Sequence, residues 1–107
     1  IKYPEQLQQR INKQPLSPLY LADKTTLINI MEMVSGLFLS KNIVYQNGKP
    51  AYLVDLAKAF EWLFNIKIGD CYQKHEDVIK RKPGKLTGFL NGLVELIKKE
   101  HDKKGYR

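Results

Sequence analysis

Apolar residues recur at helical spacing in four separate segments of this chain, and this periodicity restricts the fold more than any other feature. Side chains three or four residues apart lie on one side of a helix, so each segment can bury one apolar stripe. The segments are residues 23–40, 52–64, 70–82 and 86–103. The pattern predicts a mainly α-helical fold with four main helices, and a length of 107 residues predicts a single domain.

Each stripe identifies the residues that we expect to face the core. They are Leu27, Met31, Val34 and Phe38 in the first helix, Leu53, Leu56, Ala57, Phe60, Leu63 and Phe64 in the second, Cys71, Tyr72, His75, Val78 and Ile79 in the third, and Leu86, Phe89, Leu90, Leu93, Leu96 and Ile97 in the fourth. Asp23 is a good N-cap residue for the first helix. Trp62 lies beside the second stripe, and we expect it to be partly buried at the edge of the core or to form a contact surface, with burial favoured.

Short breaks between these segments indicate where the chain turns. Asn47-Gly48 is typical of a type I′ turn, in which both central residues have positive φ. A short β-hairpin and an irregular loop are equally expected there, because Pro50 limits strand pairing. Gly69-Asp70 predicts a corner at which Asp70 caps the third helix, with Gln73 completing a variant of the capping box. Pro83-Gly84 predicts the end of that helix.

The two ends of the chain differ from its middle. Residues 1–22 are mostly polar and contain three prolines, so we expect a linker or an N-terminal arm from a preceding domain. We expect residues 23–104 to form the helical domain and residues 105–107 to form a tail.

Positive charge is concentrated in the second part of the chain. The net charge is +7, of which residues 1–65 contribute +2 and residues 66–107 contribute +5. Such an imbalance favours an anionic partner, either nucleic acid or an anionic lipid surface, although a lysine-rich face can also serve solubility alone. No apolar run is long enough for a membrane helix, so we expect no membrane partner.

The sequence contains no pattern typical of a catalytic or metal site. Cys71 is the only cysteine, so an internal disulfide is impossible, and this composition suits a cytoplasmic protein. Cys71 and His75 are four residues apart, but His101 is distant, and zinc requires three or four protein ligands. Glu76 and Asp77 are adjacent and diverge on a helix. We therefore expect no enzyme activity, no metal and no cofactor.

The second and third helices, joined by the corner at Gly69, have the outline of a helix-turn-helix. The corner is longer than the usual turn of about three to four residues. We expect Gln73 and Lys74 on the outer side of the third helix to be candidates for contacts with base edges. The residues expected to contact DNA phosphates are Lys80, Arg81, Lys82 and Lys85. Alternatively, these four cations only offset the dipole at the helix end.

Three phrases of the sequence resemble the C-terminal domain of RteC proteins, which are regulators carried by conjugative mobile elements. The phrases are DKTTLINIMEMV, AYLVDLAKAFEWLFNIKIGDCYQKHEDVIKRK and TGFLNGLVELIKK, and the resemblance covers residues 20–103. Its most specific residues are Phe60, Phe64-Asn65-Ile66, Gly69-Asp70, Tyr72, Arg81-Lys82 and Phe89-Leu90. The resemblance implies a transcriptional regulator of excision or transfer genes that binds double-stranded DNA. It also implies a helix-turn-helix or winged-helix-like domain, and no catalytic residue.

A second interpretation is a non-enzymatic domain for protein interaction or dimerisation. In that case the amphipathic fourth helix, with the small residues Gly88 and Gly92, would pack against a partner, and the chain could form a homodimer. A role at an anionic membrane ranks third, because no segment combines a broad exposed apolar face with a basic one.

Overall fold

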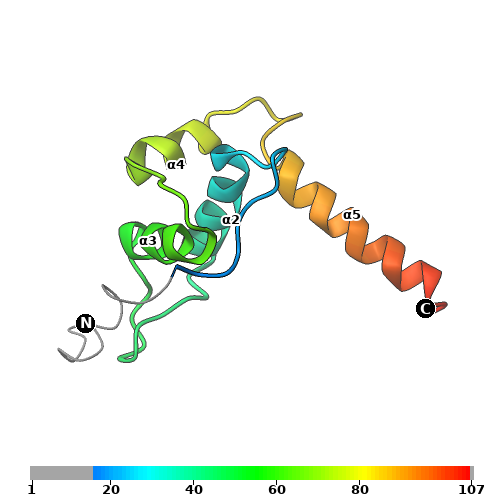
Figure 1. Ribbon diagram of the computed structural model, residues 1–107, viewed down its shortest axis with the longest axis horizontal. Coiled ribbons are helices and arrows are strands. Elements are labelled where there is room, and N and C mark those ends of the chain that lie inside the picture. Colours follow the sequence, from blue (N-terminus) through cyan, green and yellow to red (C-terminus); the bar gives the residue numbers. More distant parts are fainter. Residues whose placement is uncertain (1–15, 107) are drawn as a thin grey trace.

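A computed structural model describes residues 16–106, in which three helices form a body and one helix projects from it (Figure 1). The helices are α2 (Leu27–Ser40), α3 (Leu53–Phe64), α4 (Cys71–Ile79) and α5 (Gly88–Lys103). Helix α2 packs against the other three, and α3 also packs against α4. The four predicted helices are thus confirmed, and the fold is mainly α in a single small domain. None of the described helices is both long and apolar enough to cross a membrane.

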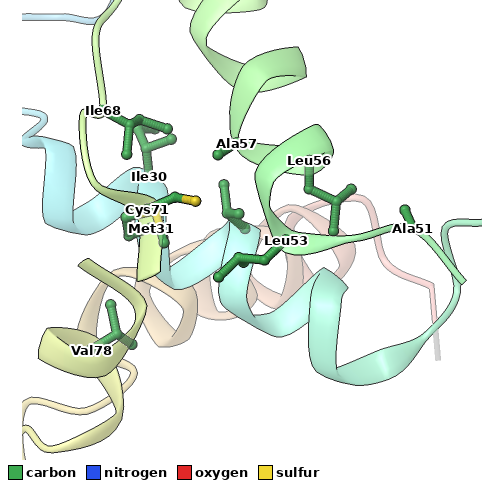
Figure 2. Close-up of a cluster of buried hydrophobic side chains, with 10 residues drawn as sticks. Ile30, Met31, Ala51, Leu53, Leu56, Ala57, Ile68, Cys71 and Val78 are labelled. Carbon is green, nitrogen blue, oxygen red and sulfur yellow. The ribbon is translucent and has the colours of Figure 1, made fainter. Parts of the chain in front are cut away.

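The core lies between α2, α3 and α4 (Figure 2). Its buried hydrophobic residues are Ile30, Met31, Val34, Ala51, Leu53, Leu56, Ala57, Ile68, Cys71 and Val78. Helix α5 contributes no fully buried residue. Its first turns reach α2, where Leu90 packs across Gly36, and the rest of the helix extends away from the body (Figure 1). The fully buried apolar residues therefore all belong to the body, and the first turns of α5 add partly buried ones.

Helix α2 begins at Leu27, so the N-cap predicted at Asp23 is wrong. The backbone N–H of Thr25 donates to the carbonyl oxygen of Ala22 at 2.9 Å, which places Asp23 inside a preceding turn. The cap is instead Thr26, whose side-chain oxygen accepts from the backbone N–H of Asn29 at 3.4 Å. A threonine at this position satisfies one of the free donors of the first helical turn.

The N-cap predicted at Asp70 is confirmed. One carboxylate oxygen of Asp70 accepts from the backbone N–H groups of Tyr72 and Gln73, each at 3.1 Å. The side chain of Gln73 donates to Asp77 instead of returning to Asp70, so the predicted capping box is incomplete. Helix α4 ends at Ile79, earlier than predicted. Helix α5 begins at Gly88, two residues later than predicted.

A very short hairpin joins α2 to α3. The backbone N–H of Tyr45 donates to the carbonyl oxygen of Lys49 at 2.8 Å, and Val44 pairs with Pro50 in an isolated antiparallel bridge. Gly48 has a φ of 86°, but Asn47 is not among the residues with positive φ, so the predicted type I′ turn is wrong. A three-residue loop that ends in a left-handed glycine is the next most common hairpin connection.

Several large side chains that were expected in the core are exposed, among them Leu96 and Ile97 of α5, at 63% and 71%. Tyr72 and Ile79, expected to face the core, are 63% and 44% exposed. The reason is that the short helix α4 buries only Cys71 and Val78 fully, and these two define a narrower inner face. Trp62 is 49% exposed, so its predicted burial at the edge of the core is also wrong.

Residues 16–22 run along the body before α2. The side-chain amide of Asn65 donates to the carbonyl oxygens of Ser17, at 2.6 Å, and Leu19, at 2.9 Å. Ser17 is buried, and Leu21 packs against the core. The predicted N-terminal arm lies outside the described residues over positions 1–15. In the predicted tail, Gly105 and Tyr106 follow Lys104, the C-cap residue of α5, and Arg107 lies outside the described residues.

Candidate nucleic-acid interface

Three exposed lysines lie in the connection between α4 and α5, and we call residues 80–85 the basic turn. The backbone N–H of Lys85 donates to the carbonyl oxygen of Lys82 at 2.8 Å. Pro83 and Gly84 occupy the two positions between them, so Lys82 and Lys85 stand at the ends of one β-turn. The Cα atoms at the ends of such a turn lie within about 7 Å of each other. The fold thus brings the backbones of two exposed lysines close together at one corner.

Lys80 precedes this pair and belongs to a polar row along α4. Its ammonium group lies 3.4 Å from Asp77, whose carboxylate also accepts from the side chain of Gln73 at 3.0 Å. The hydrogen bond from Gln73, and then the charge of Lys80, hold the pKa of Asp77 below its usual value. Because the side chain of Lys80 remains 64% exposed, this ion pair leaves its ammonium group accessible to a partner.

Arg81 differs from its neighbours because its side chain turns inward to Glu32 of α2. Its guanidinium Nη1 donates to Glu32 Oε2 at 3.0 Å. The side chain of Glu32 is only 1% exposed, and that of Arg81 is 25% exposed. The same carboxylate accepts from the backbone N–H of Phe89 at 3.3 Å and from that of Leu90 at 3.1 Å. The carboxylate of Glu32 therefore has two roles: it caps the first turn of α5, and it neutralises the charge of Arg81.

The residues predicted to contact base edges lie on α4, but they differ in exposure. Gln73 is exposed and engaged with Asp77, whereas Lys74, on the next position of the helix, is half-buried. The exposed side of α4 also carries Tyr72, Glu76 and Ile79, which the sequence reasoning did not select. Of the predicted phosphate contacts, the structure brings Lys80, Lys82 and Lys85 into one exposed turn and directs Arg81 to the interior.

Cys71 and His75 occupy the inner side of α4. The Cys71 thiol is buried, and burial raises its pKa. His75 Nδ1 lies 2.7 Å from the hydroxyl oxygen of Ser35, and its ring meets that of Phe38 edge to face. Within the described residues no group of three or more potential ligands could hold a metal ion. Both side chains join α4 to α2.

The sequence analysis did not select Glu32, although this residue bonds to Arg81 at the start of the connection and to Phe89 and Leu90 at its end. A signal was present, because Glu32 is the only charged residue between Thr25 and Ser40. It also lies four residues after Ile28 and four before Gly36, within the side of the helix that the apolar pattern directs inward. A lone carboxylate in such a position requires partners, because an unpaired buried charge is strongly unfavourable.

Comparison with known families identifies the chain. A family model described as RteC protein matches residues 3–104, which is nearly the whole sequence. The chain belongs to the RteC family. This confirms the resemblance seen in the sequence. No curated protein matches, and no solved structure matches.

The residues that carry the RteC resemblance mainly build the corners of the fold. Asn65 ends α3 with a positive φ, and Gly69 has a φ of 80° in the corner before α4. Asp70 caps α4, while Arg81 and the N–H groups of Phe89-Leu90 meet at Glu32. These motif residues therefore determine how the helices are connected, and the basic turn contains the Arg81-Lys82 pair together with the exposed Lys80 and Lys85.

Proposed function

We propose that this RteC-family chain is a DNA-binding transcriptional regulator of the excision or transfer genes of a mobile element. In this proposal α3, the corner at residues 65–70 and α4 act as a helix-turn-helix-like unit. The basic turn contacts phosphates of duplex DNA at the end of α4. The protein is non-enzymatic, needs no cofactor and acts in the cytoplasm.

The observation that carries the proposal is the exposure of Lys80, Lys82 and Lys85 within six consecutive residues. Lysine ammonium groups that neutralise phosphates release counterions, and this supplies much of the affinity for DNA. The β-turn holds Lys82 and Lys85 at neighbouring positions, so both can reach one strand of the duplex. The local surplus of positive charge agrees with the +5 balance of residues 66–107.

Base contacts would come from the exposed side of α4, which begins next to the corner. Gln73 remains the first candidate, because its amide can pair with an adenine edge once it exchanges its bond to Asp77. Lys74 remains the second candidate, although its stem is half-buried. The carboxylates of Glu76 and Asp77 lie on the same helix, where they would repel phosphates and select against a misplaced duplex.

The proposal is tested with a fluorescent duplex taken from the DNA upstream of neighbouring genes of the element. The dissociation constant is measured by anisotropy at several salt concentrations, for the parent chain and for Lys82→Ala/Lys85→Ala. We expect binding that weakens with salt, and a slope of log K against log salt that is shallower by about 2 in the double variant.

The matched control is Lys24→Ala/Lys49→Ala, which removes the same charge at two exposed sites outside the basic turn. We expect its slope to remain that of the parent chain. Binding that is absent even at low salt would refute the proposal of DNA binding. Equal slopes for the two double variants would remove the basic turn from the interface.

A second candidate function, protein interaction or dimerisation, is favoured by the distal half of α5. Leu96 and Ile97 are 63% and 71% exposed although they continue the apolar stripe of Phe89, Leu90 and Leu93. Sedimentation at increasing concentration separates the two functions. A dimer without affinity for DNA supports this second candidate, whereas a salt-sensitive complex with DNA supports the first.

A further inference from the structure

We infer that Glu32 is a positioning residue for DNA binding, because its buried carboxylate holds both ends of the loop that carries Lys82 and Lys85. The inference rests on the proposed function, since it concerns the same lysines. Helix α2 takes no part in the proposed contacts with DNA. According to this inference, a residue of α2 nevertheless determines the position of the basic turn.

The loop is pinned at its two ends by a single oxygen atom. Glu32 Oε2 accepts from Arg81 Nη1 at 3.0 Å and from the backbone N–H of Phe89 at 3.3 Å. Residues 82–88 lie between these two points. The second oxygen, Oε1, accepts from the backbone N–H of Leu90 at 3.1 Å and fixes the direction in which α5 leaves.

Burial makes this anchor strong and specific. The Glu32 side chain is 1% exposed, so water cannot replace its protein partners, and every bond to it is charge-assisted. Within the loop itself, backbone bonds join Lys85 to Lys82 and Gly88 to Lys85. These local bonds shape the turn. At its start, the backbone N–H of Arg81 donates to the carbonyl oxygen of Val78 at 3.2 Å, so α4 also holds this residue. Glu32 adds the attachment of the Arg81 side chain and of the far end at Phe89, and these two bonds fix how residues 82–88 lie against the body.

In this arrangement Arg81 and the lysines have different roles. Arg81 uses its guanidinium on Glu32, and its side chain is 25% exposed. Lys82 and Lys85 are exposed and have no ion-pair partner among the described residues. Arg81 thus acts as the second half of the anchor, and the lysines are free for phosphates.

The test is Glu32→Gln, studied by anisotropy with the duplex and salt series described above. A glutamine offers one acceptor oxygen, so it can accept at one side of the site while its NH₂ group faces a donor on the other. With the NH₂ group in the place of Oε2, both ends of the loop lose their acceptor. With it in the place of Oε1, the N–H of Leu90 loses its acceptor, and the bonds to Arg81 and Phe89 lose the negative charge that strengthens them. We expect at least a several-fold loss of affinity and a salt slope that is shallower by about 1 to 2.

The sign of this change separates positioning from simple electrostatics. Glu32→Gln raises the net charge by one, so a change in charge alone would tighten binding to DNA. Asp23→Asn is the matched control, because it makes the same chemical change at an exposed site. We expect the control to bind as the parent chain does, or slightly more tightly. Circular dichroism confirms that each variant is folded at the temperature of the assay.

A second variant leaves the buried anchor untouched. Two glycines inserted between Gly84 and Lys85 keep Glu32, Arg81 and every lysine, but separate the lysines of the turn. We expect the same loss of affinity and slope, even if Glu32→Gln does not fold. Parental affinity and slope in the insertion variant, or in folded Glu32→Gln, would overturn the inference while leaving the proposed function intact. A parent chain that does not bind DNA would overturn both.

Discussion

Asn65 combines two roles that few residue types could fill. It ends α3 with a φ of 54°, a left-handed conformation that asparagine adopts more readily than most residues. Its side-chain amide then donates to the carbonyl oxygens of Ser17 and Leu19. The same side chain therefore attaches the segment before α2 to the end of α3. This accounts in physical terms for an asparagine at position 65 of this chain.

Cys71 gives a prediction at the same scale. Burial raises the pKa of its thiol, so the reactive thiolate is scarce near neutral pH. We expect Cys71 in the folded protein to react with a water-soluble disulfide reagent at pH 8 at least about tenfold more slowly than in the denatured protein. The absorbance of the released thiol measures both rates.

The same pKa shift predicts a decrease in stability at alkaline pH. Folding favours the protonated thiol, so this contribution is fully present below the unfolded pKa of about 8.5 and disappears as pH rises through the higher folded pKa. In Cys71→Ala this part of the pH dependence should be absent when urea melts at pH 7 and pH 10 are compared. In the reagent experiment of the previous paragraph, equal rates of reaction of Cys71 in folded and denatured protein would contradict the burial of the thiol.

At the scale of elements, the caps of α2, α4 and α5 come from different places in the chain. Thr26 caps α2 and Asp70 caps α4 through side-chain oxygens, whereas Thr87 at the start of α5 makes no side-chain cap bond. Glu32 replaces that cap from another helix. A local sequence signal identified the cap of α4, but it placed the cap of α2 three residues too early, at Asp23. The cap of α5 depends on a residue more than fifty positions away and becomes visible only in the folded chain.

The caps give a paired prediction. Asp70→Ala removes an acceptor from the N–H groups of Tyr72 and Gln73, so it should lower the free energy of unfolding by about 0.5–2 kcal/mol. Asp23→Ala changes the residue that the sequence alone selects as a cap, yet it should stay within about 0.5 kcal/mol of the parent. Urea denaturation followed by circular dichroism measures both. A larger loss for Asp23→Ala than for Asp70→Ala would contradict the observed helix boundaries.

For the whole molecule, the sequence was sufficient to predict the fold class and the approximate helices, because helical periodicity is a local property. It was also sufficient to place Lys82 and Lys85 beside a turn. It could not predict that Arg81 turns inward, because this depends on an ion pair with Glu32 of α2 that forms only in the tertiary structure. Nor could it predict that Leu96 and Ile97 extend beyond α2, since a continuous apolar stripe does not reveal how long its partner is.

The projection of α5 from the body gives the last prediction. Leu90 is half-buried and packs across Gly36 of α2, whereas Leu96 is 63% exposed on the same helix. Leu90→Ala should therefore lower the free energy of unfolding by roughly 1–2 kcal/mol, because it loses apolar burial and contact with α2. Leu96→Ala makes the same chemical change and should stay within about 0.5 kcal/mol in dilute protein.

The same two variants also test self-association when thermal unfolding is measured at several protein concentrations. If α5 pairs with a second copy through Leu96, the midpoint of thermal unfolding of the parent chain should rise with concentration, because association stabilises the folded state by mass action. Leu96→Ala should abolish that rise, whereas Leu90→Ala should lower the midpoint at every concentration without removing the rise. A midpoint independent of concentration in the parent chain would exclude α5 as a dimer contact in this range. An equal loss of stability in the two variants in dilute protein would instead show that α5 packs along its whole length on its own domain.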